Sequence, residues 1–464
     1  MFPLIMTSAQ AEEVHNVSLR ILEEIGVRLE HDAIVERMVA AGARLGREAQ
    51  VVHFPAGMVR DYLAAAPQEV ILHGRNGDTF RLTADSEAIY WTNPAMYIWD
   101  GRTRCRITTH HLAAIARLCT FLPNVHGVIG TALADTNPAC SDFVGLRVMA
   151  QNTGKHLRVL CSSPLGAEAI SEMKTVFPGN WFSMGFTAHG PLRWTHLALD
   201  IFRKTAGKRI PATINGEPMA GVTGPVSLAG TIAVGNAEIL AGIVVNQVLE
   251  PGRPVIYNLG LAHVMDMKAA TAVTGGPENC LLAAASAAMG RFYRLPSSSW
   301  ASTDAVFEDE QAALEKMFAL YTHVENQVNL IWGLGQLESE LTISLSQLLI
   351  DNEMIEYIRH YRRGIPFGAE DLALDTIRQV GIGGNFLDTE HTYRNYRTHL
   401  FQPSLLNRQR RENCPQDLAE RARELAASLL SGTKEGEKEQ KKVGEEISWQ
   451  ELVNIENRYL AKLK

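Results

Sequence analysis

The chain has 464 residues, of which 51 are acidic and 44 are basic, so its net charge at neutral pH is −7. A nucleic-acid-binding protein would carry an excess of lysine and arginine, and a disordered chain would hold fewer apolar residues than the 46% found here. The six cysteines are scattered along the chain, which excludes a disulfide scaffold and a CxxC zinc motif.

Residues 1–85 are predicted to form a small helical cap followed by a β-hairpin. Ser8 and Asp32 are each expected to cap a helix and Pro55 to open a third, because each of these residues precedes apolar side chains at helical spacing. The stretch 70–82 reads as two strands around Asn-Gly, the strongest short-range hairpin signal. No chemistry is visible in this unit.

Residues 86–340 are predicted to form a closed (β/α)8 barrel of the TIM type, which makes the chain an α/β protein. Short apolar runs alternate with segments of helical periodicity, eight of the former with seven of the latter between them. The strands are expected at 88–93, 125–133, 156–163, 181–188, 210–216, 254–260, 296–303 and 329–335. An open dinucleotide-binding sheet is disfavoured, because the turn after the first strand has no GxGxxG motif.

The remainder of the chain is predicted to be helical. Residues 341–432 are expected to form packing helices, and residues 433–464 a charged tail with a short last helix that docks on its own chain or swaps to a partner. The N-terminus lacks the basic and apolar regions of a secretion signal, and glycine and proline interrupt the least charged run, so we expect a cytoplasmic protein without a membrane span.

Catalytic groups of such a barrel lie where its strands end. The residues predicted there are mostly aromatic or uncharged: Trp91, Tyr97, His189, Asn215, Glu217, Trp300, Asp304 and Trp332. No cluster with metal-ligand spacing and no nucleophile elbow is present, so no metal and no firm catalytic residue are assigned. A glycosidase-type carboxylate pair, Glu217 with Glu338, stays open because the sequence does not give their separation.

The aromatic residues in this set suit an organic cation. Tryptophan and tyrosine faces attract quaternary ammonium groups through the ring quadrupole, at roughly 0.5–2 kcal/mol per ring. We therefore predict a cage of Trp91, Tyr97, Trp300 and Trp332, with His189, Asn215 and Asp304 orienting the other end of the substrate.

Several long segments resemble the trimethylamine methyltransferase superfamily. The resemblance is carried by PENCLLAAASAAMGRFYRLPSSSWASTDAVFEDEQAALEK at 277–316, by NLIWGLGQLESELTISLSQLLIDNEMIEYIRHYRRGI at 329–365, and by GIGGNFLDTEHTYRNYRTHLFQPSLLNRQRRE at 381–412. It extends over nearly the whole chain up to about residue 430.

The resemblance implies a (β/α) barrel that moves a methyl group from an amine to the Co(I) of a corrinoid held by a separate small protein. None of the 15 histidines follows an aspartate by two positions, so the DxHxxG motif of a corrinoid-binding domain is absent and no tightly bound cofactor is expected. The chain holds no pyrrolysine and is similar to the branch whose members demethylate quaternary amines such as glycine betaine, carnitine or proline betaine. A homo-oligomer is expected.

The sequence departs from the family pattern at two positions. Val306 stands where the family often has lysine, and Asn385 where it often has histidine. Loss of a lysine charge would change how a substrate carboxylate is held, so these positions bear on the identity of the substrate more than on the reaction. The alternatives left open are a quaternary-amine-binding barrel without transfer activity and a barrel lyase or isomerase acting on a carboxylated substrate.

Overall fold

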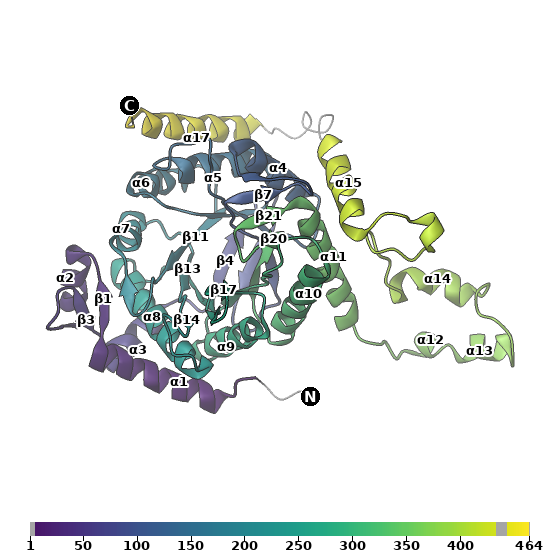
Figure 1. The fold of residues 1–464 in the computed structure, drawn as a ribbon, viewed down its shortest axis with the longest axis horizontal. Helices are drawn as coiled ribbons and strands as arrows, with labels where there is room; N and C mark the ends of the chain where they lie inside the picture. The colour runs from purple at the N-terminus through teal and green to yellow at the C-terminus, as the bar shows by residue number, and fades with distance from the viewer. Residues whose placement is uncertain (1–4, 433–442, 464) are drawn as a thin grey trace.

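The computed structural model describes residues 5–432 and 443–463. Its centre is a closed barrel of eight parallel strands in the order β10-β11-β13-β15-β18-β19-β6-β9 (Figure 1). The strands are β6 (Ile89–Thr92), β9 (Gly127–Ile129), β10 (His156–Val159), β11 (Phe182–Thr187), β13 (Ala212–Asn215), β15 (Val255–Gly260), β18 (Ser297–Trp300) and β19 (Leu330–Leu334). All eight lie inside the predicted ranges, which confirms the (β/α)8 barrel.

Helices surround the barrel between successive strands and after the last strand. They are α4 (Thr109–Thr120), α5 (Ser141–Asn152), α6 (Pro164–Met173), α7 (His196–Thr205), α8 (Leu228–Leu249), α9 (Pro277–Tyr293), α10 (Glu310–Glu325) and α11 (Leu345–Arg362). Hydroxyl or carboxylate caps begin several of them: Ser163 accepts from Gly166 N at α6, and Asp309 accepts from Gln311 N at α10. α8 is apolar and long enough to cross a membrane, but 72% of its apolar window is buried inside the protein, as in a core helix.

The N-terminal unit covers one side and one end of the barrel. Its helices are α1 (Ser8–Arg20), which continues as a π-helical turn (Ile21–Ile25), α2 (Asp32–Ala40) and α3 (Ala56–Ala65). A small sheet joins β1 (Val27–Leu29), β2 (Arg44–Leu45) and β3 (Val51–His53) to β12 (Arg193–Trp194). Thr7, one residue before the expected Ser8, accepts the capping hydrogen bond of α1.

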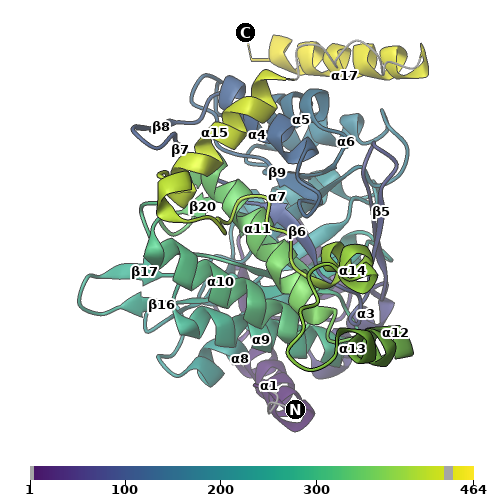
Figure 2. The ribbon, with the colours of Figure 1, turned by 90° about the vertical axis from the view of Figure 1, so that its right-hand side faces the viewer.

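A hairpin closes the N-terminal end of the barrel. β4 (Val70–His73) and β5 (Thr79–Leu82) pair as predicted from the Asn-Gly turn, and Val70, Leu72 and Leu82 are buried in one apolar cluster with Trp91 and Trp332. Asn180 fixes the hairpin to the barrel, because it donates to the carbonyl of Ile71 at 2.8 Å. In Figure 2 β5 lies at the opposite end of the molecule from β16 and β17.

The opposite end is the mouth of the barrel, where the strands end and small sheets form a rim. One sheet contains β14 (Met219–Ala220), β16 (His263–Asp266) and β17 (Thr271–Val273). The other contains β20 (Gln336–Leu337), β21 (Thr342–Ser344), β7 (Tyr97–Trp99) and β8 (Arg104–Arg106). Loops of the rim therefore decide what enters the barrel.

The C-terminal segment divides into helices that pack and helices that do not. α15 (Leu418–Ser431) packs on α11, whereas α12 (Ala369–Leu372), α13 (Leu374–Val380) and α14 (Glu390–His399) bury none of their residues and extend away from the barrel (Figure 1). Ala373, whose φ is 47°, separates α12 from α13. We call residues 365–400 the arm.

The last helix docks on its own chain, one of the two options that the sequence left open. α17 (Val443–Ala461) lies along α5 and α6, where Tyr459 donates to Glu172 at 2.6 Å and Arg147 pairs with Glu456. α17 begins inside the stretch expected to be a charged linker, and the rest of that stretch, 433–442, lies outside the described residues.

Candidate active site

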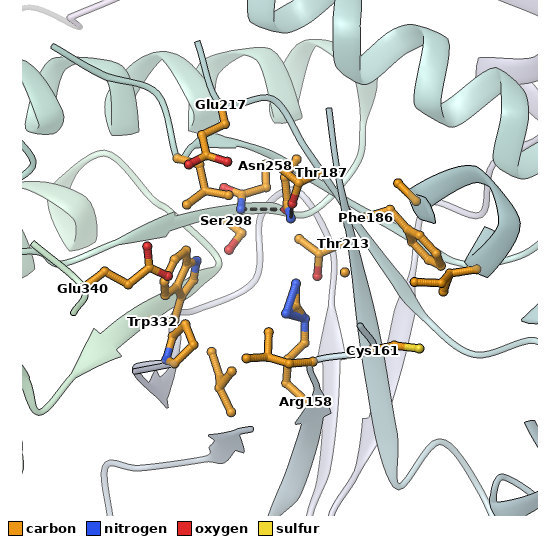
Figure 3. Close-up of a pocket in the computed structure, with 18 of the residues that line it drawn as sticks. Arg158, Cys161, Phe186, Thr187, Thr213, Glu217, Asn258, Ser298, Trp332 and Glu340 are labelled. Atoms are coloured by element: carbon orange, nitrogen blue, oxygen red, sulfur yellow. Dashed lines mark hydrogen bonds between the residues drawn. The ribbon is translucent and has the colours of Figure 1, made fainter. Parts of the chain in front are cut away.

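A cavity of about 270 Å³ lies inside the barrel, between the hairpin that closes one end and the mouth at the other. Its size is just below the range of about 300–1,000 Å³ typical of pockets for drug-sized ligands, so it suits a smaller molecule. Side chains from all eight barrel strands line it, and Figure 3 shows them converging on the space. This is where a barrel enzyme is expected to bind its substrate.

Two tryptophans form the apolar walls of the cavity. Trp91 is 1% exposed and Trp332 7% exposed, so the protein buries each ring except for the part that faces the cavity. Trp91 can lie flat across the barrel because its neighbour Gly127 has no side chain: a Cβ on Gly127 would stand 2.5 Å from the indole ring. Both rings are therefore fixed in position before any ligand binds.

Arg158 brings a positive charge to the wall of the cavity. It is the third residue of β10, and its guanidinium group points from the strand toward Thr213 in Figure 3. Burial lowers the pKa of Arg158 to about 10, while the carboxyl of Glu340 opposes this shift, so the side chain stays protonated at neutral pH. Arginine in a barrel strand is unusual, since a buried charge is costly unless something pairs with it.

Two carboxyl groups face the cavity from the side of the mouth. Glu217 follows the end of β13 and Glu340 follows β20. Burial raises the pKa of Glu217 to about 7, and burial together with the charge of Glu217 raises the pKa of Glu340 to about 8. At neutral pH this pair holds less than two negative charges, so the upper part of the cavity is only weakly anionic.

The loop that carries Glu340 has an uncommon backbone. Glu338, Ser339 and Glu340 have φ values of 57°, 50° and 82°, three consecutive non-glycine residues in the left-handed region. Each such residue costs of order 1–3 kcal/mol and persists only where the surroundings fix it. Here Ser339 donates to Asp304 at 2.6 Å, and Asn93 donates to the carbonyl of Glu340 at 3.2 Å.

An amide network occupies another wall. Asn258 donates to Asn215 at 2.9 Å, and Asn215 donates to Thr187 at 2.9 Å. Both ends of the Asn215 amide are thus engaged with neighbours, and its role is to hold the wall rigid. His189 lies at the exposed edge, and burial of part of the ring, with the charge of Arg193, lowers the pKa of His189.

Five of the eight side chains expected at the site line this cavity: Trp91, His189, Asn215, Glu217 and Trp332. The other three lie elsewhere. Tyr97 sits in the rim sheet with the Arg104 guanidinium 3.6 Å from its ring centre, so that ring already binds a cation of the protein. Trp300 is buried behind Trp332, with ring centres 5.3 Å apart.

Asp304 acts on the rim loops. Its carboxylate accepts hydrogen bonds from the backbone N–H groups of Thr274 and Gly275 and from Ser339.

Glu338, the possible partner of Glu217 in a glycosidase, pairs instead with Arg104 at 2.9 Å and accepts from Thr342. Across residues 5–432 and 443–463, no group of three or more histidine, cysteine or acidic residues is arranged to hold a metal ion.

Sequence reasoning missed Arg158 and Glu340, two ionisable residues that line the cavity. The signal for Arg158 was present: it is the one ionisable residue between Leu157 and Cys161, in an otherwise apolar strand. Glu340 gave no comparable signal, because its position depends on the backbone conformation of the loop from Glu338 to Leu341.

The chain is similar to known proteins over most of its length. The model of the trimethylamine methyltransferase family matches residues 3–447. The trimethylamine methyltransferase of Desulfitobacterium hafniense is 30% identical, over 90% of this chain and 87% of that protein, and the glycine betaine methyltransferase of the same species is 29% identical, over 87% of each. The crystal structure of the monomethylamine methyltransferase of Methanosarcina barkeri shares the fold, with a TM-score of 0.56 at 12% identity, covering 91% of this chain and 87% of that one. This chain belongs to the trimethylamine methyltransferase family.

Proposed function

We propose that this protein takes a methyl group from a quaternary amine of the betaine type and delivers it to the Co(I) of a corrinoid held by a separate protein. The observation that carries the proposal is the cavity below the barrel mouth with Trp91 and Trp332 as its fixed walls. Family membership supports the reaction class, and one relative bears the name glycine betaine methyltransferase.

The side chains of the cavity suit this reaction. A quaternary nitrogen leaves as a neutral amine, so no general acid is required. The indole faces attract the cation without forming a bond that must later break. The positive charge on nitrogen is lost as the methyl group moves, so a weakly anionic, largely apolar pocket holds the ground state less tightly than a full carboxylate pair would. The raised pKa values of Glu217 and Glu340 provide that condition.

The protein also has to orient the substrate and keep water out. The hairpin closes the floor, and the network of Asn215, Thr187 and Asn258 keeps the wall rigid. The corrinoid of the partner supplies the nucleophile for the methyl group. Binding directs the reacting methyl group at the mouth. The substrate therefore loses its translational freedom when it binds, and this entropic cost does not add to the barrier of the reaction step.

We propose further that the protein is cytoplasmic and forms a homo-oligomer. The arm exposes a row of large apolar side chains: Ile365, Phe367, Leu372, Leu374, Ile382, Leu387, Tyr393 and Leu400. Helices this short are unstable unless they pack on another surface. The arm lies toward the closed end of the barrel (Figure 2), away from the mouth that the corrinoid partner must reach, which favours a second copy of this chain as its contact.

The test is methylation of free cobalamin reduced to Co(I), followed by the absorbance change to methylcobalamin. Glycine betaine, carnitine and proline betaine are supplied in turn, with trimethylamine as the tertiary comparison. We expect methylcobalamin from at least one quaternary amine, and less of it from the Trp332→Ala variant. Binding of these amines without any methylcobalamin would support the alternative, a binding protein without transfer activity.

A further inference from the structure

The guanidinium of Arg158 lies inside the barrel without a protein partner. Among the residues that the structure describes, no oxygen accepts a hydrogen bond from this side chain, and no carboxylate stands within 4.0 Å of it; its Nε is buried and unpaired. Two other cations inside the protein do have protein partners: Lys316 pairs with Asp351 at 2.9 Å, and Arg253 donates through Nε to the carbonyl of Ile210 at 2.8 Å, although its Nη2 is also unpaired. A buried arginine left unpaired is costly, so its retention indicates an external anion as its partner.

The barrel is shaped around this side chain. A Cβ on Gly185, in the neighbouring strand β11, would stand 1.6 Å from Nη2 of Arg158. Glycine is therefore the only residue at position 185 that leaves the guanidinium in its place beside the cavity. This close fit holds the fork of the arginine toward the cavity.

Two hydroxyl groups beside the guanidinium are also unpartnered. Thr213 is 3% exposed and Ser298 is fully buried, and both line the cavity. The Oγ1 of Thr213 and the Oγ of Ser298 have no hydrogen-bond partner in the described structure. Figure 3 shows Thr213 opposite the end of Arg158, with Ser298 to one side. The forked N–H donors of Arg158 and the two hydroxyl groups can all donate to a planar anion with two oxygens. This is the way in which arginine recognises a carboxylate.

The charges in the cavity are ordered along the barrel axis. Arg158 lies within a strand, whereas Glu217 lies two residues beyond the end of β13 and Glu340 lies in the rim loop after β20. The side chain of Trp332 stands between Arg158 and Glu340 in Figure 3. The positive end of the cavity is thus deep, and the end that attracts cations faces the mouth.

We propose that Arg158 binds the carboxylate of the substrate, with Thr213 and Ser298 as supporting donors. The substrate is then an ammonium carboxylate that enters carboxylate first and leaves its ammonium group at Trp332, below the mouth. This inference rests on the proposed function only for the position of the ammonium group. It makes Arg158 the residue that separates betaines from quaternary amines without a carboxylate, and it explains how a chain with Val306 in place of lysine still recognises a carboxylate.

Calorimetric titration of the full-length protein tests this without any corrinoid. Glycine betaine, carnitine and proline betaine are the carboxylated probes, and choline is the matched quaternary amine without a carboxylate. We expect at least one betaine to bind more tightly than choline. Arg158→Met should weaken betaine binding about tenfold or more, because the charged hydrogen bonds to the carboxylate are lost, and should change choline binding by less than about twofold.

A second variant displaces the guanidinium group of Arg158 but keeps its charge. Gly185→Ala displaces the guanidinium and should also weaken betaine binding selectively. Gly145→Ala is the control, because a Cβ there meets only ordinary contacts at 3.6 and 3.7 Å. Arg158→Lys keeps the positive charge but loses the forked donors, so it should bind betaines more tightly than Arg158→Met and less tightly than the wild type.

Equal losses for choline and betaines, or unchanged betaine binding in Arg158→Met with a native unfolding transition, overturn the inference. So does a wild-type protein that binds choline as tightly as every betaine. Betaine binding that depends on Arg158 but yields no methylcobalamin leaves the inference standing and removes the proposed transfer activity, so the two failures are distinguishable.

Discussion

Ser339 donates a hydrogen bond of 2.6 Å to Asp304, and this bond joins the loop after the eighth barrel strand to the loop after the seventh. Asp304 also accepts from the backbone of Thr274 and Gly275. One carboxylate therefore holds together the rim loops around the strained segment that carries Glu340.

Replacement of Asp304 by asparagine should destabilise the protein. The variant keeps the size of the side chain but puts an N–H₂ group in place of one accepting oxygen, so buried donors of Thr274 and Ser339 lose part of their partner. We expect the free energy of unfolding in urea to fall by about 1–3 kcal/mol. Asp375→Asn is the control, since its side chain is 94% exposed on α13; equal effects of the two substitutions would contradict the role given to Asp304.

Removal of the indole of Trp332 should weaken the binding of quaternary ammonium ions with or without a carboxylate. Trp332→Ala is expected to lower the affinity for choline by about 0.5–2 kcal/mol, as loss of one ring face predicts, measured by calorimetric titration. Tyr97→Ala is the comparison: its ring is faced by Arg104 outside the cavity, so we expect unchanged affinity. A larger loss with Tyr97→Ala would place the cage at the rim.

The carboxyl pair should make the stability of the protein depend on pH. In the folded protein the pKa of Glu217 is about 7 and that of Glu340 about 8, both above the ordinary value of 4.5. The folded state therefore holds protons that the unfolded chain releases. The contribution of these two groups to the free energy of unfolding is complete below about pH 4.5 and decreases as the pH rises toward 8. Unfolding in urea at pH 5, 7 and 9 measures this.

Glu340→Gln should reduce that dependence, because the amide does not titrate. The variant is expected to gain stability relative to the wild type as the pH rises. Glu370→Gln, on the arm, serves as the matched control and should follow the wild-type curve. A Glu340→Gln protein with the wild-type pH dependence would show that the carboxyl at position 340 does not titrate in this range.

The arm should mediate self-association. Ile382→Ser together with Leu387→Ser replaces two of its most exposed apolar residues, at 109% and 79% exposure. We expect light scattering after size-exclusion chromatography to report an oligomer for the wild type and a smaller species for the double variant. Leu314→Ser, 73% exposed on α10, is the control. A monomeric wild-type protein would contradict the homo-oligomer.

The architecture was largely predictable, since each barrel strand is a short apolar run between helical segments of the right length. The hairpin followed from one dipeptide, Asn76-Gly77. The N-cap of α1 was misplaced by one residue because Thr7 and Ser8 are both capping residues. The arm was unpredictable in another way: its residues have helical periodicity, but nothing in the periodicity says whether a helix packs on its own chain.

The predicted residues that do line the cavity lie in a barrel strand or within two residues of its end: Trp91, Asn215 and Trp332 in strands, and His189 and Glu217 just beyond them. Tyr97, Trp300 and Asp304 share a location near strand ends but point to the rim or behind the cavity wall, because neighbouring side chains and hydrogen bonds decide their direction. Polarity alone could not separate these two groups.

The hairpin of β4 and β5 has a kinetic consequence. With the floor closed, both the amine and the methyl acceptor must use the mouth, so under the proposed function the amine enters first and the demethylated product leaves only after the partner has separated. Turnover should follow an ordered sequence, in which an excess of the partner protein at low amine concentration occludes the entrance and slows the reaction.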